Sequence, residues 1–541
     1  MYISAMKLIL LINLFFLITC SSFGPQKKEL FVLSILHTND HHGHYLPDEK
    51  GQYGMAARKT LIDELRRTSI AQKGFTLLLS GGDINTGTME SDMFDAEPDF
   101  KGMKYIGYDA MAVGNHEFDN EFSVLKNQEK IAGFPFLAAN IFYKGTNKLA
   151  FEREYIIREY KGFKIGIFGL TTKDTPFKAS NQKAKELFDF KDIVETSKAV
   201  VKKLRPQVDL IIAVTHVGHE GSLTSNGDID LAKKVDGIDV IVGGHSQEII
   251  NAEVHNNTVI VQAEDWGKYV GALELKVFED KSIQLVKGSG FEYTLHPVNH
   301  THKVRGEYVY KGKFFKDDIV LNRLFLTFKL KADRLGLKKI GTLNKKLDGD
   351  RKLVRSTQMP IGQFFGRAIL LKEKDVDGIV LNSGSIRSSL EAGDITWKDL
   401  HRLHPYGNTI CSVKLSFEEF FKYVEKITSD NFFDLAGQGS YPQIVNMQLV
   451  FREKKLVEIK GKNWWIKNEN GKLSSNRKSV KLGTMNFLAG GGDNYPVIKD
   501  KSSFVDTGFM INAAMRELVE RSKVLNVSTF YKSANNRILF Q

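Results

Sequence analysis

From residue 30 onward, short apolar runs alternate with longer amphipathic segments. The runs end abruptly in glycine or polar residues, as buried strands often do. They predict strands at Phe31–Leu36, Phe75–Ser80, Ala110–Val113, Lys164–Phe168, Leu210–Val214 and Val240–Val242. Two amphipathic stretches between them, Ala56–Arg67 and Ile193–Leu204, predict helices. Alternating strands and helices are typical of an α/β fold.

The segment Asp317–Leu335 has helical periodicity and is long enough to bridge two domains. The alternation then resumes, with predicted strands at Gly378–Leu381, Thr409–Leu415, Gln448–Phe451 and Val480–Thr484 and predicted helices at Phe417–Ile427 and Asn512–Arg521. We therefore expect one domain over residues 28–316, a bridging helix over 317–338 and a second α/β domain over 339–541.

The first twenty residues have the pattern of a signal peptide. Lys7 precedes an apolar run, Leu8–Thr19, which is too short to span a membrane and about as long as a signal-peptide core. We expect residues 1–20 to direct export, to the periplasm or the cell envelope. Leu17–Cys20 is similar to the cleavage box of bacterial lipoproteins, in which the cysteine is acylated. The alternative is an ordinary signal peptide, whose cleavage removes Cys20.

Composition limits the possible chemistry. Hydrophobic residues make up 42% of the 541 residues and charged residues 26%, a balance that excludes disordered, collagen-like and coiled-coil proteins. Cys20 and Cys411 are the only cysteines, so a metal would be held by His, Asp, Asn or Gln. Of the net charge of +12, most lies in residues 341–541, with 31 Lys and Arg against 21 Asp and Glu. That region contains no basic tract of the kind that binds nucleic acid, so we expect no nucleic-acid partner.

Polar clusters directly follow five of the predicted strands. Each contains Asp, Asn, His or Gln, and several contain glycine: His37–His44, Gly81–Asp83, Gly114–Asp119, Thr215–His216 and Gly243–Gln247. The carboxyl ends of strands in α/β sheets form the edge at which ligands bind. The five clusters therefore predict one site.

The residue types in these clusters indicate a metal site. Imidazole, carboxylate and amide ligands suit divalent ions such as Zn, Mn, Fe or Co. About seven candidate ligands are too many for one tetrahedral ion. Two ions about 3.5–4 Å apart, bridged by a carboxylate, would use them all and form the clamp that hydrolyses phosphate esters.

The chain resembles the bacterial periplasmic 5′-nucleotidase/UDP-sugar hydrolase family. The resemblance lies in the segments Leu36–Gly43, Gly82–Asp83, Gly114–Asp119 and Gly244–Gln247. The N-terminal domain of that family is a calcineurin-like metallophosphoesterase sandwich. The resemblance implies one metal held by Asp40, His42 and Gln247, a second held by Asn115, His216 and His245, a bridge through Asp83, and a catalytic dyad of His116 and Asp119. His41 and His44 are not ligands in the family, and His219 receives no role.

The second domain carries motifs for recognition, namely arginines beside glycine-rich turns and aromatics beside amides. The resemblance implies that Tyr406 and Phe487 sandwich the base and that Asn408 binds its edge. It also implies that Asp493 binds the ribose hydroxyls and that Gly439 lines the pocket. The negatively charged groups of the substrate would bind to Arg351, Arg355 and Arg387. In this chain Tyr406 replaces a phenylalanine. Asn382–Ser385 replaces a triple-glycine turn, so Ser383 and Ser385 place side chains where the family has none, which bears on substrate fit there.

Together these features predict an exported, monomeric enzyme with two divalent metal ions, Zn, Mn or Co, which removes phosphate from nucleoside 5′-phosphates. UDP-sugars are a further possible substrate class. In the family the bridging helix lets the second domain rotate and carry substrate to the metals. Two alternatives are a 2′,3′-cyclic-nucleotide phosphodiesterase with 3′-nucleotidase activity and an inactive nucleotide-binding surface protein.

Overall fold

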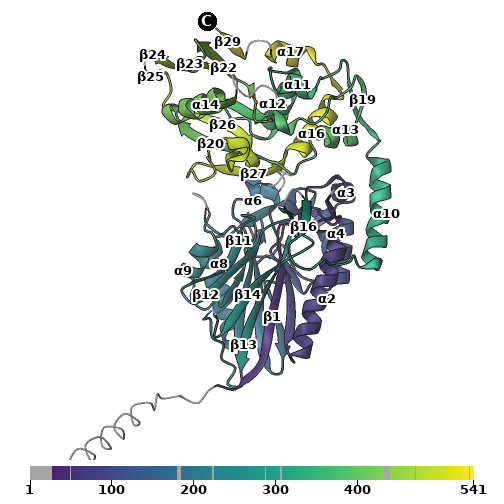
Figure 1. The fold of residues 1–541 in the computed structure, drawn as a ribbon. Helices are drawn as coiled ribbons and strands as arrows, with labels where there is room; N and C mark the ends of the chain where they lie inside the picture. The colour runs from purple at the N-terminus through teal and green to yellow at the C-terminus, as the bar shows by residue number, and fades with distance from the viewer. Residues whose placement is uncertain are drawn as a thin grey trace, which may run out of the picture.

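The computed structural model describes residues 27–48, 50–178, 184–221, 225–286, 288–304, 307–431, 439–469, 471–534 and 537–540. Two domains are joined along one side by a long helix (Figure 1). The predicted signal peptide and Cys20 lie outside the described residues. Within the described ranges, no helix has the length and apolarity needed to cross a membrane.

The N-terminal domain is built on two six-stranded sheets, with strand orders β14-β13-β1-β2-β3-β4 and β11-β12-β10-β9-β7-β6. The strands of the first are β1 Glu29–Thr38, β2 Phe75–Ser80, β3 Ala110–Ala112, β4 Phe136–Leu137, β13 Tyr269–Phe278 and β14 Phe291–Pro297. Those of the second are β6 Tyr155–Tyr160, β7 Phe163–Thr171, β9 Leu210–His216, β10 Val240–Val242, β11 Ile249–His255 and β12 Thr258–Ala263. All six predicted strands are present. Five of them form parallel pairs, so that their carboxyl ends lie at the same edge of a sheet: β1 pairs with β2, β2 with β3, and β9 with β10.

The two sheets pack face to face around one apolar core. Leu33, Ile35 and Leu77 of the first sheet and Ile212 and Val242 of the second are fully buried in it. Helices cover the outer faces: α2 Met55–Ala71, α4 Glu97–Ile106 and α5 Phe122–Ala132 on the first sheet, α8 Ile193–Leu204 and α9 Asp228–Lys234 on the second. Because strands are buried on both faces, they are almost continuously apolar, which made them recognisable in the sequence.

The predicted bridging helix is α10, Ile319–Leu335. It starts at Asp318, whose carboxylate accepts hydrogen bonds from the backbone N–H groups of Val320 and Leu321 at 3.0 and 2.9 Å. Its apolar face, which includes Phe325 and Phe328, packs into the core of the N-terminal domain. The helix therefore belongs structurally to the first domain along this face and leads the chain into the second (Figure 1).

The C-terminal domain surrounds a five-stranded sheet of order β21-β18-β26-β20-β27, with β27 at its edge. These strands are β18 Gly378–Asn382, β20 Thr409–Ser416, β21 Pro442–Val445, β26 Ser479–Met485 and β27 Val505–Met510. The helices α12 Pro360–Lys372, α14 Phe417–Asn431 and α16 Ile511–Ser522 pack with it in a single core. A three-stranded sheet, β19 Gly393–Thr396, β17 Lys339–Leu343 and β28 Val524–Leu525, lies beside it, and a second five-stranded sheet is formed by β25 Lys472–Ser475, β24 Trp465–Glu469, β23 Lys455–Lys460, β22 Gln448–Arg452 and β29 Ile538–Phe540.

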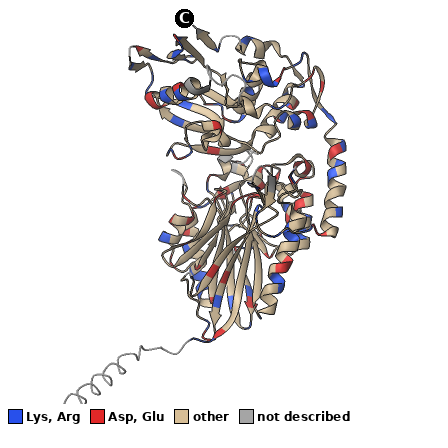
Figure 2. Cartoon of the chain, viewed as in Figure 1, with Lys and Arg blue, Asp and Glu red and all other residues tan. Residues whose placement is uncertain are grey.

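The charge of the second domain is distributed rather than gathered. Figure 2 shows Lys and Arg interspersed with Asp and Glu over its visible helices and strands. Cys411 lies fully buried in β20, and burial raises the pKa of its thiol. Cys411 is therefore a small core residue, as its position in a predicted strand indicates.

Candidate metal centre and substrate pocket

The polar clusters of the sequence meet at one end of the N-terminal sandwich. Asp40 and His42 follow β1, Asp83 follows β2, and Asn115 and His116 follow β3. From the second sheet, His216 ends β9, and His245 and Gln247 follow β10. The expectation that five strand ends serve one site therefore agrees with the arrangement of the sheets.

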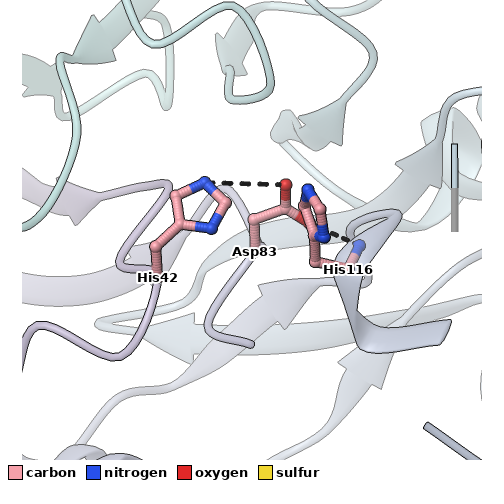
Figure 3. A group of neighbouring side chains, drawn as sticks. All are labelled: His42, Asp83 and His116. Carbon is pink, nitrogen blue, oxygen red and sulfur yellow. Dashed lines mark hydrogen bonds and ion pairs between the residues drawn. The ribbon is translucent and has the colours of Figure 1, made fainter. Parts of the chain in front are cut away.

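Asp83 lies at the middle of this cluster. Its Oδ2 is 3.0 Å from His216 Nε2 and 4.0 Å from His42 Nε2, and its Oδ1 accepts a hydrogen bond of 2.9 Å from the backbone N–H of His116 (Figure 3). Potential ligand atoms of His42, Asp83 and His116 lie within 4.8 Å of one another, and so do those of Asp83, His216 and His245. Asp83 belongs to both groups, which is the placement that a bridging carboxylate requires.

Asp40 and Gln247 lie beside His42. Asp40 Oδ1 is 3.9 Å and Gln247 Nε2 2.9 Å from His42 Nε2. The other ring nitrogen of His42, Nδ1, lies 3.2 and 3.1 Å from the backbone carbonyls of Asn85 and Thr86. A histidine that donates Nδ1–H to a carbonyl presents Nε2 as a ligand, so His42 fits a metal site.

Asn115 and His245 lie beside His216. Asn115 Oδ1 is 3.2 Å and His245 Nδ1 3.1 Å from His216 Nε2. His216 repeats the arrangement of His42, because its Nδ1 lies 2.7 Å from the carbonyl of Gly81. Asn115 is buried, and its Nδ2 has no hydrogen-bond partner among the described residues. The side chains of both sets of predicted ligands thus converge on the region around Asp83.

The backbone of this cluster is strained. Asp40, His42, Asp83, His245 and Gln247 have φ values of 51°, 47°, 53°, 80° and 55°. A residue other than glycine costs about 1–2 kcal/mol in this left-handed region. Such strain persists where the surrounding structure fixes it and is concentrated at functional sites. The placement of these five side chains therefore lowers the stability of the folded protein.

Glu117 fastens the loops of the cluster together, a role that sequence reasoning missed. Its buried carboxylate accepts four backbone hydrogen bonds, from Asp83, Ile84 and Asn85 at 3.0, 2.8 and 3.1 Å and from Gly114 at 2.6 Å. Burial and the charge of Asp83 raise the pKa of Glu117 to about 7. One side chain thereby joins the loop after β2 to the loop after β3.

His116 and Asp119 form a hydrogen-bonded pair. The segment His116–Phe118 is a single 3-10 turn, and it places His116 Nδ1 2.6 Å from Asp119 Oδ2. The Thr86 hydroxyl donates to the same oxygen at 2.6 Å. Burial alone would lower the pKa of His116, but Asp119 and Asp83 outweigh it and raise that pKa to about 10. Burial would likewise raise the pKa of Asp83, and the neighbouring histidines hold it well below its usual value.

The remaining histidines of the motifs lie around the cluster. His41 Nε2 is 3.0 Å from Asp99 Oδ1. The ring of His44 stacks on Trp266 at a centroid distance of 4.3 Å. His219 Nε2 lies 3.2 Å from a carboxylate oxygen of Glu253.

The predicted substrate pocket of the second domain has three arginines near one another. Burial and the charges of Arg351 and Arg387 lower the pKa of Arg355, while Asp493 and Tyr406 act in the opposite direction. The guanidinium carbon of Arg387 lies 6.0 Å from the centroid of the Tyr406 ring. Tyr406 is 40% exposed, so its ring is available to a ligand.

Phe487 and Asn408 are joined through Asn486. The Asn486 side-chain oxygen accepts hydrogen bonds from Asn408 Nδ2 at 3.1 Å and from the backbone N–H of Phe487 at 2.8 Å. Phe487 is 44% exposed. Gly439 lies next to Asp493, because a Cβ atom added to it would be 3.6 Å from the Asp493 carboxylate.

The side chains of Ser383 and Ser385, which stand where the family has glycines, lie beneath the turn. The Ser383 hydroxyl donates to the backbone carbonyl of Tyr441 at 2.8 Å, and the Ser385 hydroxyl donates to the side-chain oxygen of Asn382. Both serines are buried, at 0% and 3% exposure. Their hydroxyls have partners beneath the turn, so they form part of its floor. Asn382 in turn donates to Asp493 at 2.6 Å.

Comparison with known proteins identifies both domains. Residues 33–248 match the family model of calcineurin-like phosphoesterases, and residues 339–500 match that of the 5′-nucleotidase C-terminal domain. The protein UshA of Yersinia enterocolitica is 38% identical over 536 residues, covering 93% of this chain and 94% of the relative. A 5′-nucleotidase of Vibrio cholerae is 39% identical over 544 residues, covering 94% and 95%.

A solved structure shares the fold over most of the chain. The NAD nucleotidase NadN of Haemophilus influenzae superposes with a TM-score of 0.74 at 21% identity, covering 94% of this chain and 99% of that one. A calcineurin-like phosphoesterase domain implies divalent metal ions, and the His and Asp groups around Asp83 are suited to hold them. The chain belongs to the family of UshA-like 5′-nucleotidases, in which a calcineurin-like phosphoesterase domain precedes a 5′-nucleotidase C-terminal domain.

Proposed function

We propose that this protein is a metal-dependent 5′-nucleotidase that removes phosphate from nucleoside 5′-phosphates. The observation that carries the proposal is the position of Asp83, shared by two groups of potential metal ligands and hydrogen-bonded to the backbone of His116. The names of the relatives, UshA and 5′-nucleotidase, support the choice of nucleotides as substrates.

We assign the metal ligands as the resemblance to the family implies, and the groups of potential ligands that share Asp83 support this choice. Asp40, His42 and Gln247 would hold one ion, Asn115, His216 and His245 would hold the other, and Asp83 would bridge them. Nitrogen, carboxylate and amide donors without thiolates favour Zn, Mn or Co. When bound, such ions neutralise phosphoryl oxygens and make water a better nucleophile.

The dyad would act on the phosphoryl group directly. His116 carries its proton on Nδ1 toward Asp119, and the Thr86 hydroxyl holds that carboxylate from the other side. A protonated imidazole fixed in this way stabilises negative charge that develops on phosphoryl oxygens. Asp119 and Thr86 orient the ring, so they are positioning residues.

The second domain would recognise the nucleoside and the charged groups. Tyr406 and Phe487 would sandwich the base, Asn408 would bind its edge, and Asp493 would accept the ribose hydroxyls. Arg351, Arg355 and Arg387 would bind negatively charged groups, and Gly439 leaves room beside Asp493. Each base–aromatic stack contributes about 1–3 kcal/mol.

A substrate screen tests this proposal. We expect purified protein loaded with Zn, Mn or Co to release phosphate from AMP faster than it opens the phosphodiester ring of cyclic 2′,3′-AMP. UDP-glucose, ADP and ATP belong in the same screen, because their rates define how far the substrate range extends beyond AMP. Faster cleavage of the cyclic nucleotide would favour the phosphodiesterase alternative. Nucleotide binding without hydrolysis under any metal would favour the inactive binding protein.

We also infer that the protein is exported, because Lys7 and the apolar run Leu8–Thr19 have signal-peptide character. Acylation at Cys20 would hold it to a membrane through buried acyl CH₂ groups, each worth about 0.8 kcal/mol. Replacing Cys20 by Ser is then expected to release the protein into the soluble exported fraction without changing its specific activity. A mature N-terminus that maps downstream of Cys20 would show ordinary secretion instead.

A further inference from the structure

A glycine of the second domain covers the catalytic histidine of the first. Gly508 lies in β27, and a Cβ atom added to it would be 2.6 Å from His116 Nε2 and 3.5 Å from Asn115 Nδ2. Nε2 is the ring nitrogen that is not bonded to Asp119, so it is the nitrogen that must face a phosphoryl group. His116 is 3% exposed and Asn115 is 1% exposed. A phosphate ester therefore cannot reach His116 Nε2 while Gly508 occupies this position.

Gly508 lies in a β-bulge of the edge strand β27. Thr409 of β20 pairs with Met510 and Cys411 pairs with Asp506, so three residues of β27 bulge out opposite Ile410. Gly508 is at the centre of the bulge with φ of 70°, a conformation that glycine adopts without strain. The helix α6, Thr175–Lys178, of the first domain lies beside this strand (Figure 1).

Side chains brace the bulge and connect it to the base-binding loop. One oxygen of Asp506 accepts the backbone N–H of Gly508 at 2.9 Å, and the other accepts the Thr409 hydroxyl at 2.8 Å. Thr409 directly follows Asn408, whose carbonyl accepts the N–H of Ile511 at 3.0 Å. Movement of the loop that holds the base would therefore be transmitted to Gly508.

The loop also contacts the first domain at a second glycine. A Cβ atom on Gly407 would lie 3.0 Å from the Trp266 ring, which stacks on His44. The backbone N–H of Trp266 donates to the carbonyl of Asp40 at 2.8 Å. These two contacts between the domains are made by glycines, which permit close backbone approach.

We propose that Gly508 is a specificity-determining residue: its bulge excludes phosphate esters from His116 unless the second domain binds a base and withdraws it. This proposal rests on the proposed function, because it concerns access to that site. The proposal predicts that substrates are selected in two ways. The pocket selects nucleotides by binding, and the bulge rejects small phosphate monoesters that lack a base. Selectivity would then depend on a backbone position that touches neither base nor ribose.

The test compares Gly508→Ala with Gly393→Ala in the full-length protein. Both glycines have positive φ, but a Cβ atom at Gly393 meets no atom within 4 Å, so this variant controls for backbone strain alone. Hydroxyl-radical footprinting with mass spectrometry reads the solvent exposure of His116 without requiring activity. We expect Gly508→Ala to increase oxidation of His116 by about tenfold, equivalent to a tenfold shift in the population of the uncovered state. Gly393→Ala is expected to match the wild type.

The second readout is selectivity. The ratio of kcat/KM for AMP to kcat/KM for glycerol 3-phosphate is expected to fall in Gly508→Ala, because hydrolysis of the small ester rises. Asp506→Ala removes the brace without adding an atom at position 508, and it is expected to change both readouts in the same direction. Wild-type levels of His116 oxidation in both variants would overturn the proposal. If no variant hydrolyses any ester while footprinting still differs, the cover is real and the proposed function is wrong.

Discussion

The proposed metal centre and the proposed substrate pocket differ in how far their side chains are buried. In the metal centre the side chains are buried or half-buried, five of them on strained backbone, and Glu117 holds two of their loops through four hydrogen bonds. In the pocket the two aromatic rings are 40% and 44% exposed. The proposed catalytic residues would thus be held in place before substrate arrives, whereas the proposed base-binding rings are open to solvent.

This difference agrees with what each region must bind. Divalent ions require ligands held within narrow limits, so the fold accepts backbone strain to place them. A nucleotide base requires flat faces that can be reached from solvent. We therefore expect substitutions in the two regions to affect different quantities, namely metal binding and turnover in one and KM in the other.

Asp83→Asn is expected to have the largest effect. The substitution removes a charge placed between two groups of ligands, so the loss is at least about a thousandfold in kcat for AMP. Metal analysis is expected to find one ion or none per chain, with an unchanged circular dichroism spectrum. A variant that keeps two ions and near-normal turnover would contradict the bridging assignment.

Glu117→Gln is expected to have the second-largest effect. It would loosen the loops that carry the metal ligands without replacing a ligand. Its amide group would place a donor against backbone N–H groups that now meet a carboxylate oxygen, and metal affinity is expected to fall by about 10- to 100-fold. A chelator competition assay measures this. The control is Asp192→Asn, because Asp192 also accepts two backbone N–H groups, at 2.9 and 3.0 Å, but caps α8. Equal loss of metal affinity in both variants would mean that Glu117 has only a general structural role.

The smallest expected effect concerns His404 and the loss of folding stability at acidic pH. His404 is fully buried against the Phe365 and Tyr406 rings, and burial lowers its pKa to about 4. The folded protein therefore keeps it neutral, while the unfolded chain takes up a proton below about pH 6.5. Stability from this group is present above that pH and is lost as pH falls toward 4, by up to about 3 kcal/mol.

Urea unfolding of His404→Phe tests this prediction. The variant is expected to lose less stability than the wild type between pH 7 and pH 4, because phenylalanine cannot bind the proton. An identical pH dependence in both proteins would show that His404 is not the group responsible.

Much of the first domain was predictable because its strands are almost uniformly apolar. The strand Phe75–Ser80 and the helix Ile193–Leu204 were predicted with the bounds that the structure shows. The site residues follow those strands directly, so their convergence was also predictable from the rule for sheet edges.

Features that depend on backbone geometry or on contact between domains were not predictable. No sequence signal shows that Glu117 accepts four backbone N–H groups or that Ser383 and Ser385 point into the floor of a turn. The approach of Gly508 to His116 requires the relative position of the domains. In each case a neighbour distant in sequence decides the role of the residue.

The most direct test of the division between chemistry and recognition uses two substrates that differ only in the base, AMP and ribose 5-phosphate. We expect Phe487→Ala to lower kcat/KM for AMP by about tenfold or more, chiefly through KM, and to leave the much slower hydrolysis of ribose 5-phosphate, which lacks a base, unchanged. His116→Ala is expected to lower kcat for both substrates alike. If Phe487→Ala reduces hydrolysis of both substrates equally, the exposed aromatic ring is structural, and the assignment of recognition to the second domain is wrong.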